Sequence, residues 1–352
     1  MDEKILEFAV LGVSYKTASI AVRERIALTG KTLHDGLAGL CRQELIKEAM
    51  ILSTCNRFEV YVAYEAGKDD SVKVRLQEIL ELKQYPLQSG YWFTGQRAVL
   101  HLFRVASSLD SQVIGENQIL GQLTRAYLKA KDAGTINYVL DMLMQKAVST
   151  GKRVRTETGI SNGNISIGKL AVKMVEKDLD NLQDRRILII GAGETAETVV
   201  NYLKERNAAA VLVSNRTYSK ACILAAELQG RAVKFDQIEK ELPSVDIILS
   251  STSARHLVLR KDRFELLVRK DKLIIFDLAV PRDIDPGIGG LKGVKLYNID
   301  ELGSVVEENY KKRLVEAGKA EAIIEQEMVK VYSVREPVKC QRLINLVQEA
   351  VR

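Results

Sequence analysis

The residue with the clearest chemical potential is Cys55, in the segment I-L-S-T-C-N-R-F-E-V-Y at 51–61. It follows a strand-like apolar run, and its neighbours Thr54, Asn56 and Arg57 can supply hydrogen bonds or positive charge. Such a polar setting is expected to lower the pKa of a thiol and favour the nucleophilic thiolate. From this pattern alone, a catalytic cysteine and a structural cysteine are about equally supported.

The other three cysteines, Cys41, Cys222 and Cys340, lie in helical patterns far apart along the chain. They form no C-x-x-C pair and no cluster with histidine. We therefore expect no disulfide framework and no metal site.

A second chemical signal is the pattern G-x-G-x-x-A formed by Gly191, Gly193 and Ala196. It comes directly after the apolar run Ile187 to Ile190 and opens a helical pattern, which is the context of a dinucleotide fingerprint. Backbone amides at the start of that helix would hold a pyrophosphate. A tight turn without a ligand is the less favoured alternative. The predicted cofactor contacts in this turn are Gly191, Ala192, Gly193, Glu194, Thr195 and Ala196.

The end of the next apolar run indicates which dinucleotide would bind. About 22 residues after the fingerprint the sequence reads Ser214, Asn215, Arg216 and Thr217, where an NAD enzyme would place an acid. A cation there can pair with a 2′-phosphate, so NADPH is favoured, with Asn215, Arg216 and Thr217 as contacts. A solvated Arg216 is the alternative. Ser251, Thr252 and Ser253, after another strand-like run, are plausible further contacts.

Four segments must position these residues. Residues 1–95 mix short strand-like and helical patterns, and 97–178 show only helical spacings of three and four. Residues 185–297 alternate apolar strands with helices, which predicts a parallel sheet buried on both faces. Beyond Asn298 apolar residues from Leu302 to Val331 predict one amphipathic helix of about 30 residues, ended by Pro337.

Composition excludes several classes of protein. The 352 residues carry 52 Lys and Arg against 46 Asp and Glu, a net charge of +6 that is too weak to indicate duplex nucleic acid binding by itself. No apolar run approaches the ~20 residues of a membrane span, and the first residues lack a secretion signal, so a cytoplasmic protein is expected. The cluster Lys152, Arg153 and Arg155 suits either a phosphate contact or a solvated face.

Several motifs in order resemble one family, the glutamyl-tRNA reductases, from about Phe8 to Val331. The shared segments are L-G-V-S-Y-K-T-A followed by V-R-E-R, S-T-C-N-R-F-E-V-Y, H-L-F-R-V-A-S-S-L-D-S-Q-V-I-G-E-N-Q-I-L-G-Q at 101–122, G-K-R-V-R-T-E-T at 151–158, V-S-N-R-T and D-L-A-V-P-R-D-I-D-P. The resemblance implies reduction of glutamyl-tRNA(Glu) by NADPH to glutamate 1-semialdehyde, the first step of tetrapyrrole synthesis by the C5 route. It also implies that Cys55 forms a thioester and releases the tRNA.

The resemblance also assigns roles to individual residues. Thr54, Asn56 and Arg57 match the substrate contacts around the nucleophile, with Arg57 suited to a substrate carboxylate and Glu116 to the substrate ammonium. His101 matches a histidine that assists proton movement or orients the ester, although a packed core histidine is equally supported. The second substrate segment is matched by Ser111, Glu116, Asn117, Gln118 and Gln122.

The sequence departs from the family pattern in three places. Asn117 stands where many members have Pro, and Ser14 and Tyr15 replace the usual Asn-His. Only about 15 residues follow Pro337, so the dimerisation region is expected to be truncated and a homodimer weakened. An aminomutase that uses the semialdehyde is a further expected partner.

The expected architecture is α/β with three parts. Residues 1–157 form an α+β catalytic and substrate-binding domain with a helical segment, 158–297 an NADP-binding Rossmann-like domain, and 298–352 a long spine helix with a reduced dimerisation region. Two alternatives stay open: a different NADP oxidoreductase of the shikimate dehydrogenase kind, and a non-catalytic relative that kept the scaffold. A shikimate dehydrogenase-like enzyme has no use for the nucleophile loop or the segment at 101–122, and the retention of Cys55, Arg57 and Glu116 together argues against a non-catalytic relative.

Overall fold

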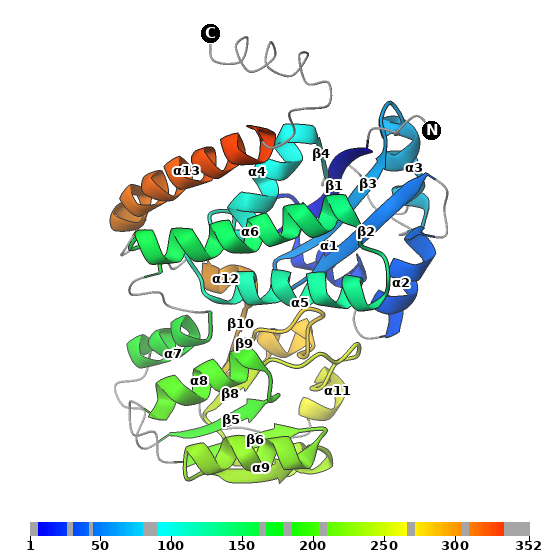
Figure 1. Cartoon of the computed structure of the whole chain (residues 1–352). Coiled ribbons are helices and arrows are strands. Elements are labelled where there is room, and N and C mark those ends of the chain that lie inside the picture. The colour runs from blue at the N-terminus through cyan, green and yellow to red at the C-terminus, as the bar shows by residue number, and fades with distance from the viewer. Residues whose placement is uncertain are drawn as a thin grey trace.

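The computed structural model describes residues 6–26, 31–41, 45–79, 90–161, 167–178, 185–204, 210–265, 272–303 and 310–333. Two sheets organise these residues (Figure 1). We refer to residues 6–161 as the N-terminal domain and to residues 167–303 as the parallel-sheet domain.

The N-terminal domain is built on an antiparallel sheet of four strands in the order β2-β3-β1-β4. The central strands β1 and β3 pair along their whole lengths, and almost every residue of β3 is buried because helices cover the sheet. The short strand β4 was not predicted from the sequence. The strands are β1 (Leu6–Ser14), β2 (Ile46–Ser53), β3 (Arg57–Glu65) and β4 (Tyr91–Thr94).

The helical region predicted at 97–178 contains α7 (Ile167–Asp178), which packs in the core of the parallel-sheet domain, and the three helices α4, α5 and α6. The apolar faces of these three helices join the core of the sheet, as in α4, where Leu102 and Phe103 are fully buried. The buried Glu48 of β2 caps the start of α6 by accepting bonds from the amides of Val139 and Leu140. The helices of this domain are α1 (Ile20–Ile26), α2 (Lys31–Cys41), α3 (Asp69–Ile79), α4 (Gly95–Ala106), α5 (Gln118–Asp132) and α6 (Tyr138–Glu157).

The second sheet has six parallel strands in the order β7-β6-β5-β8-β9-β10, which is the strand order of a doubly wound dinucleotide-binding fold. Alternate residues of β5 face opposite cores: Ile187 and Ile189 join one apolar cluster, Leu188 and Ile190 the other. The predicted α/β fold class is confirmed. The strands are β5 (Arg186–Ile190), β6 (Ala210–Asn215), β7 (Arg231–Lys234), β8 (Ile247–Ser250), β9 (Leu273–Asp277) and β10 (Val294–Asn298).

Helices flank this sheet and continue beyond it. Those of the parallel-sheet domain are α7 (Ile167–Asp178), α8 (Glu194–Lys204), α9 (Tyr218–Glu227), α10 (Ile238–Glu241), α11 (Lys261–Phe264) and α12 (Ile299–Gly303). After α12 comes α13 (Tyr310–Ser333), whose 24 residues cover most of the predicted helix, while Leu302, where that prediction began, lies in α12. It packs along α4 and α6, burying Ala320 and Ile324. Pro337 lies outside the described residues.

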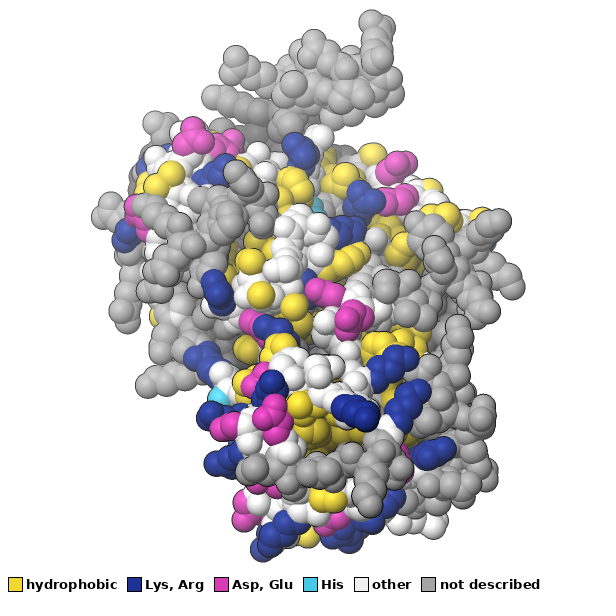
Figure 2. All heavy atoms as spheres, turned by 180° about the vertical axis from the view of Figure 1, so that it is seen from behind, with side chains coloured by type: hydrophobic (Ala, Val, Ile, Leu, Met, Phe, Trp, Pro, Cys, Tyr) yellow, Lys and Arg dark blue, Asp and Glu magenta, His cyan; other side chains and the backbone are white. Residues whose placement is uncertain are grey.

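The two domains meet at α12, which lies between the two sheets in Figure 1. The side chain of Gln112, in the loop before α5, donates to the carbonyl of Ile299 at 3.3 Å. Oppositely charged residues join them, as in the pairs Arg23–Asp300 and Arg282–Glu24, both at 2.7 Å. Figure 2 shows the molecule from behind, and acidic and basic side chains lie next to one another near the middle of this face. Across the residues described, no helix is long and apolar enough to cross a membrane.

Candidate active site

Cys55 lies at the tip of the tight turn that joins β2 to β3. The amide of Thr54 donates to the carbonyl of Arg57 across 2.9 Å, which leaves Cys55 and Asn56 as the two central residues. The Thr54 hydroxyl accepts bonds from the amides of Asn56 and Arg57 at 3.2 and 3.1 Å. Thr54 therefore shapes the turn that presents the thiol.

Cys55 lies at the domain interface and is half-buried when the whole residue is considered. Cys55 packs against the apolar cluster of the parallel-sheet domain, the same cluster that Ala192 of the fingerprint turn contacts. Burial raises the pKa of Cys55 to about 12, the charge of Glu116 acts in the same direction, and Arg23 opposes it. The expectation that the surrounding polar residues lower this pKa was therefore wrong, because desolvation outweighs the nearby cation.

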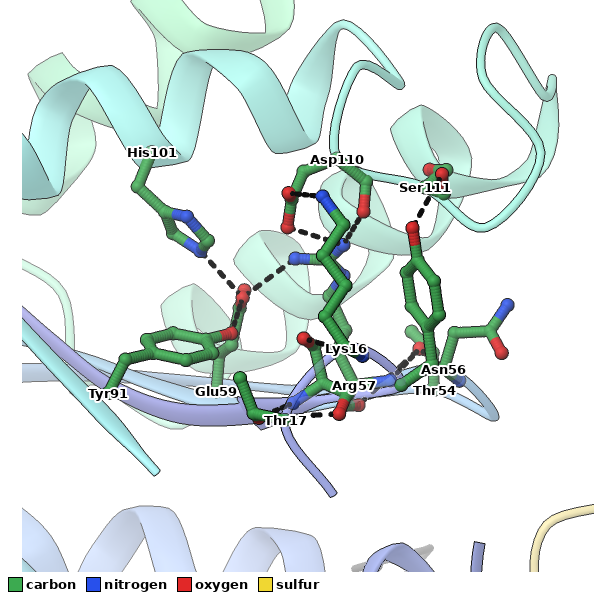
Figure 3. A network of polar contacts seen from close by, with 12 residues as sticks. Lys16, Thr17, Thr54, Asn56, Arg57, Glu59, Tyr91, His101, Asp110 and Ser111 are labelled. Carbon is green, nitrogen blue, oxygen red and sulfur yellow. Dashed lines mark hydrogen bonds and ion pairs between the residues drawn. The ribbon is translucent and has the colours of Figure 1, made fainter. Parts of the chain in front are cut away.

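Arg57 is fully buried and joins two acids of the N-terminal domain (Figure 3). Its guanidinium donates to Glu59 at 2.8 Å and to the carboxylate of Asp110 at 3.1 Å. Lys16 also pairs with Asp110. The guanidinium predicted to hold a substrate carboxylate is thus already bonded to two carboxylates of the protein.

Glu59 is the centre of this network, and sequence reasoning missed it. Its carboxylate is fully buried and accepts bonds from Arg57, from Tyr61 and Tyr91 at 2.5 Å each, and from His101 at 2.7 Å. Burial alone would raise the pKa of Glu59, but the charge of Arg57 and the bond from His101 hold it well below its usual range. A signal was present in the sequence, since a carboxylate in the middle of an apolar strand requires buried partners.

His101 is anchored by the same carboxylate. An ionised carboxylate only accepts, so the Nε2 atom of His101 carries a proton. The ring lies 5.2 Å from Tyr91 and 5.3 Å from Phe93, between centroids. His101 is therefore packed, as one reading of the sequence held, and it also faces a cavity of about 290 Å³. The cavity is lined by Ser14, Lys16, Thr17, Tyr91, Phe93, Arg97, Leu100, His101, Arg104 and Asp110.

The loop between α4 and α5 carries the second predicted substrate segment. Gly115 adopts a φ of +83°, and a Cβ there would lie 2.0 Å from the carbonyl oxygen of Ile160, so only glycine permits this path. Next to it, burial raises the pKa of Glu116. Ser111 is buried, and its carbonyl accepts a bond from Tyr15 at 3.1 Å.

The start of α5 carries the remaining substrate candidates. Asn117 is exposed and immediately precedes the helix. Gln118 and Gln122 are half-buried and four residues apart, which places them on one face of α5. Arg125 is on this face one turn further on.

The three basic residues at 152–155 have different surroundings in the structure. Arg153 bonds to Glu157 and to Glu327 of α13, both at 2.8 Å. Arg155 points inward and donates to the carbonyl of Glu116 at 3.1 Å. Lys152 alone of the three is exposed without such contacts among the residues described, so it is the cation best placed for a phosphate.

The fingerprint turn has the features of a pyrophosphate cradle. Gly191 has a φ of +116°, and a Cβ there would come 2.2 Å from the carbonyl oxygen of Ser251. A Cβ added to Gly193 would meet no atom within 4 Å, so the space beside its backbone is open to a ligand. A side chain at this position would occupy that space. Ala196 is buried against the sheet. These residues fit a dinucleotide.

Residues at neighbouring strand ends border this turn. Asn215 accepts a bond from the amide of Thr217 at 2.9 Å, and Arg216 is exposed. Thr252 is held by Asp283, which accepts bonds from its amide and its hydroxyl. Ser251 and Ser253 flank it. Glu194, the first residue of α8, pairs at 2.7 Å with Arg125 of the N-terminal domain, and Ala192 and Thr195 are half-buried beside it.

The structure thus brings the Cys55 turn and the fingerprint turn to one interface, since Cys55 and Ala192 pack against the same apolar cluster. Glu116 lies near this interface, and its charge acts on Cys55. His101 is connected to them through Glu59 and Arg57. Residues 215–217 lie further along the sheet edge, at the end of β6.

A parallel-sheet domain with a dinucleotide fingerprint, joined to a domain that carries a cysteine to their interface, defines an oxidoreductase with an NAD(P)-binding domain. Comparison with known proteins agrees. A model described as the N-terminal domain of glutamyl-tRNAGlu reductase matches residues 11–158, and one for shikimate / quinate 5-dehydrogenase matches residues 173–305. The chain belongs to the glutamyl-tRNA reductase family.

Individual relatives support this assignment. The glutamyl-tRNA reductase of Aquifex aeolicus is 41% identical over 343 residues, which cover 96% of this chain and 84% of that protein. The enzyme of Desulforudis audaxviator is also 41% identical, over 91% and 73% of the two chains. The solved glutamyl-tRNA reductase of Methanopyrus kandleri is 33% identical, covers 93% of this chain and 79% of its own, and superimposes with a TM-score of 0.52.

Proposed function

We propose that this protein reduces glutamyl-tRNA to glutamate 1-semialdehyde with NADPH, by way of a thioester on Cys55, and releases the tRNA. The observation that carries the proposal is the place of the thiol. Cys55 lies between the two domains and packs against the same apolar cluster as Ala192 of the fingerprint turn. A thiol in that position can hold an acyl group where a nicotinamide ring reaches it.

The proposed reaction has two steps. The Cys55 thiolate attacks the ester carbonyl of glutamyl-tRNA, a carbon–sulfur bond forms, and the ester bond breaks as the tRNA leaves with its ribose hydroxyl. NADPH supplies a hydride to the thioester carbonyl, and the aldehyde departs as the thiol is regenerated. A thioester accepts hydride more readily than an oxygen ester, so the covalent step prepares the acyl group for reduction.

The substrate ammonium is assigned to Glu116. Burial is the main cause of the raised pKa of Cys55, and the negative charge of Glu116 adds to it; a cation placed against this carboxylate would cancel that second contribution. Binding of the substrate would thereby assist formation of the thiolate. Asn56 supports the same site, because its buried Oδ1 atom has no donor among the residues described.

The substrate carboxylate is assigned to Arg57. The guanidinium now bonds to Asp110, which is partly exposed at the cavity wall. A substrate carboxylate would take the place of Asp110 on Arg57, with Lys16 beside it. Glu59 would remain in place and keep the guanidinium oriented. Thr54, Ser111, Asn117, Gln118 and Gln122 are proposed to complete the substrate site around these two residues.

For NADPH, the turn at 191–196 would hold the pyrophosphate. Arg216 would pair with the 2′-phosphate, since it is exposed and has no ion-pair partner within the described ranges. Asn215 and Thr217 would flank it on the same turn.

The 3′ end of the tRNA is assigned to the cavity next to His101. Arg97 lies over the ring of Phe93 at 5.0 Å, and two more cations line the cavity, Lys16, which pairs with Asp110, and Arg104, which pairs with Glu321 at 2.9 Å. Cations and aromatic rings together suit a nucleotide, because rings stack on bases and cations bind phosphates. His101 at the cavity wall would orient the ester.

Two partners remain expectations. The outer face of α13 exposes Val315 and Val329, which are about four turns apart and therefore on one side of the helix. This apolar face supports a homodimer, which sedimentation would detect. Direct transfer of the semialdehyde to an aminomutase would appear as faster coupled turnover when both enzymes are mixed.

The function is tested by incubating the protein with glutamyl-tRNA and NADPH and measuring aldehyde and free tRNA. We expect both products from the wild type and neither from Cys55→Ser, with NADPH binding unchanged in the variant. Turnover of small 3-dehydro acids instead would favour a shikimate dehydrogenase-like enzyme. Binding of tRNA and NADPH without any product would favour a non-catalytic relative.

A further inference from the structure

The side chain of Arg23 connects the nucleophile turn to the parallel-sheet domain. Arg23 is almost fully buried, with 2% of its surface exposed. Its Nε atom donates to the carbonyl oxygen of Cys55 at 3.2 Å, and its Nη2 atom donates to Asp300 of α12 at 2.7 Å. One rigid, planar guanidinium therefore spans from the backbone of the nucleophile to the other domain.

Both ends of this connection are held firmly. On one side, the Nη1 atom of Arg23 donates to the carbonyl of Ala18, just before α1, at 2.8 Å. On the other side, Asn298 caps α12 by accepting bonds from the amides of Asp300 and Glu301, and Glu301 accepts a bond from the amide of Asn298.

The short helix α12 is also anchored in its own domain. Ile299 and Leu302 are buried in the apolar core of the parallel-sheet domain, and α12 directly follows β10. The carboxylate of Asp300 consequently moves with the sheet that carries the cofactor fingerprint.

We propose that Arg23 is a positioning residue that sets the nucleophile turn against the docked parallel-sheet domain, so that Cys55 reaches its working position only while Asp300 is engaged. This inference rests on the proposed function. A mere electrostatic role would act differently: Asp300 raises the pKa of Cys55, so its loss would increase the thiolate and speed turnover. A positioning role requires that its loss slow turnover.

A neighbouring ion pair provides a matched control. Glu24 follows Arg23 in α1 and binds Arg282 of the parallel-sheet domain through both oxygens, at 2.7 Å each. This pair crosses the same interface but has no contact with Cys55. Loss of the Glu24 pair therefore weakens the interface without freeing the nucleophile turn.

The test compares Arg23→Lys, Asp300→Ala and Glu24→Gln in the full-length protein, by steady-state kinetics with glutamyl-tRNA and by alkylation of Cys55 with iodoacetamide. Lysine keeps the charge of Arg23 but cannot span three acceptors. We expect kcat to fall about 100-fold in Arg23→Lys and about tenfold in Asp300→Ala, with KM within about threefold, because small displacements of a reacting group have costs of this order. Asp300→Ala should be alkylated at least as fast as the wild type.

Glu24→Gln should keep kcat within about threefold of the wild type. The proposal is overturned if Asp300→Ala turns over as fast as the wild type, or if Glu24→Gln loses as much activity as Asp300→Ala. Asp300 is partly exposed, so its variant keeps the test valid if Arg23→Lys fails to fold. A wild-type protein that forms no aldehyde would instead reject the proposed function, while the alkylation rates would still report on the Cys55 turn.

Discussion

The Nε2 atom of His101 lies 2.7 Å from the carboxylate of Glu59, which is fully buried and also binds Arg57. One carboxylate thus orients the histidine at the cavity wall and the guanidinium proposed to bind substrate (Figure 3). A buried acid of this kind stabilises the domain only while its partners are present.

Replacement of Glu59 by Gln should destabilise the N-terminal domain by about 3–5 kcal/mol, because Arg57 would stay buried with one ionic partner fewer. Urea unfolding would measure the loss. Tyr61→Phe removes a single bond to the same carboxylate and should cost only about 1–3 kcal/mol. Equal losses in both variants would contradict a central role for the charge.

The reactivity of Cys55 should depend strongly on pH and on Glu116. With a thiol pKa of about 12, the rate of alkylation should rise about tenfold per pH unit up to pH 10 without a plateau. Glu116→Gln removes a negative charge that raises this pKa, so alkylation at pH 8 should be several times faster. Mass spectrometry of the Cys55 peptide measures both rates.

The exposed acid Glu157 provides the control, and Glu157→Gln should leave the alkylation of Cys55 unchanged. A plateau below pH 9 in the wild type would show that the thiol is already activated in the free enzyme.

Arg125 should strengthen binding of NADPH. It neutralises Glu194 at the start of α8, where a pyrophosphate would otherwise face an unpaired carboxylate. Arg125→Ala should raise the Kd for NADPH by about five- to tenfold by fluorescence titration, since charge-assisted contacts with phosphate are worth one or two kcal/mol.

Two comparisons sharpen the test of Arg125. Glu194→Gln should remove most of the effect of the arginine substitution in the double variant. Lys129→Ala, which removes an exposed cation from the same helix, should leave the Kd unchanged. If Lys129→Ala weakened NADPH binding as much as Arg125→Ala does, the effect would come from the overall positive charge of the helix and not from the specific contact of Arg125.

The stability of the parallel-sheet domain should depend on the titration of Asp277. Burial raises its pKa from 3.8 to about 7, and the charge of nearby Asp283 raises it further. The bond that Asp277 accepts from the amide of Ile284 acts in the opposite direction and is outweighed. Between about pH 4 and 7 the folded chain binds this proton and the unfolded chain does not. The contribution of Asp277 to the free energy of unfolding therefore falls as pH rises through this window.

Urea unfolding at pH 5 and pH 8 would detect this dependence. Asp277→Asn removes the group that titrates and therefore this pH dependence. Relative to the wild type, the free energy of unfolding of the variant should be higher at pH 8 than at pH 5. Asp236→Asn, at an exposed position, should show no such change. A constant difference between Asp277→Asn and the wild type at both pH values would contradict the assignment.

The elements with strong periodicity were predictable from the sequence. The apolar run before Gly191 predicts a buried parallel strand, and the small residues that follow predict a tight turn into a helix. Few other structures satisfy these two sequence patterns together. The position of Cys55 after a strand also followed from local sequence. These features depend on neighbours along the chain.

What the sequence could not show depends on contacts between distant segments. The raised pKa of Cys55 arises from burial against another domain, which no local pattern reveals. Arg23 looks like an ordinary helix residue until Asp300, 277 positions later, is found beside it. Arg155 looked like a surface cation, but it turns inward to Glu116.

The most direct measurement is a search for the covalent intermediate. The protein is mixed with glutamyl-tRNA in the absence of NADPH, quenched in acid, digested and examined by mass spectrometry. We predict that the Cys55 peptide gains the mass of one glutamyl group, that hydroxylamine removes it, and that later addition of NADPH to an unquenched sample converts it to the aldehyde. Formation of aldehyde at a normal rate with no acyl group on Cys55, or by Cys55→Ala, would contradict the account.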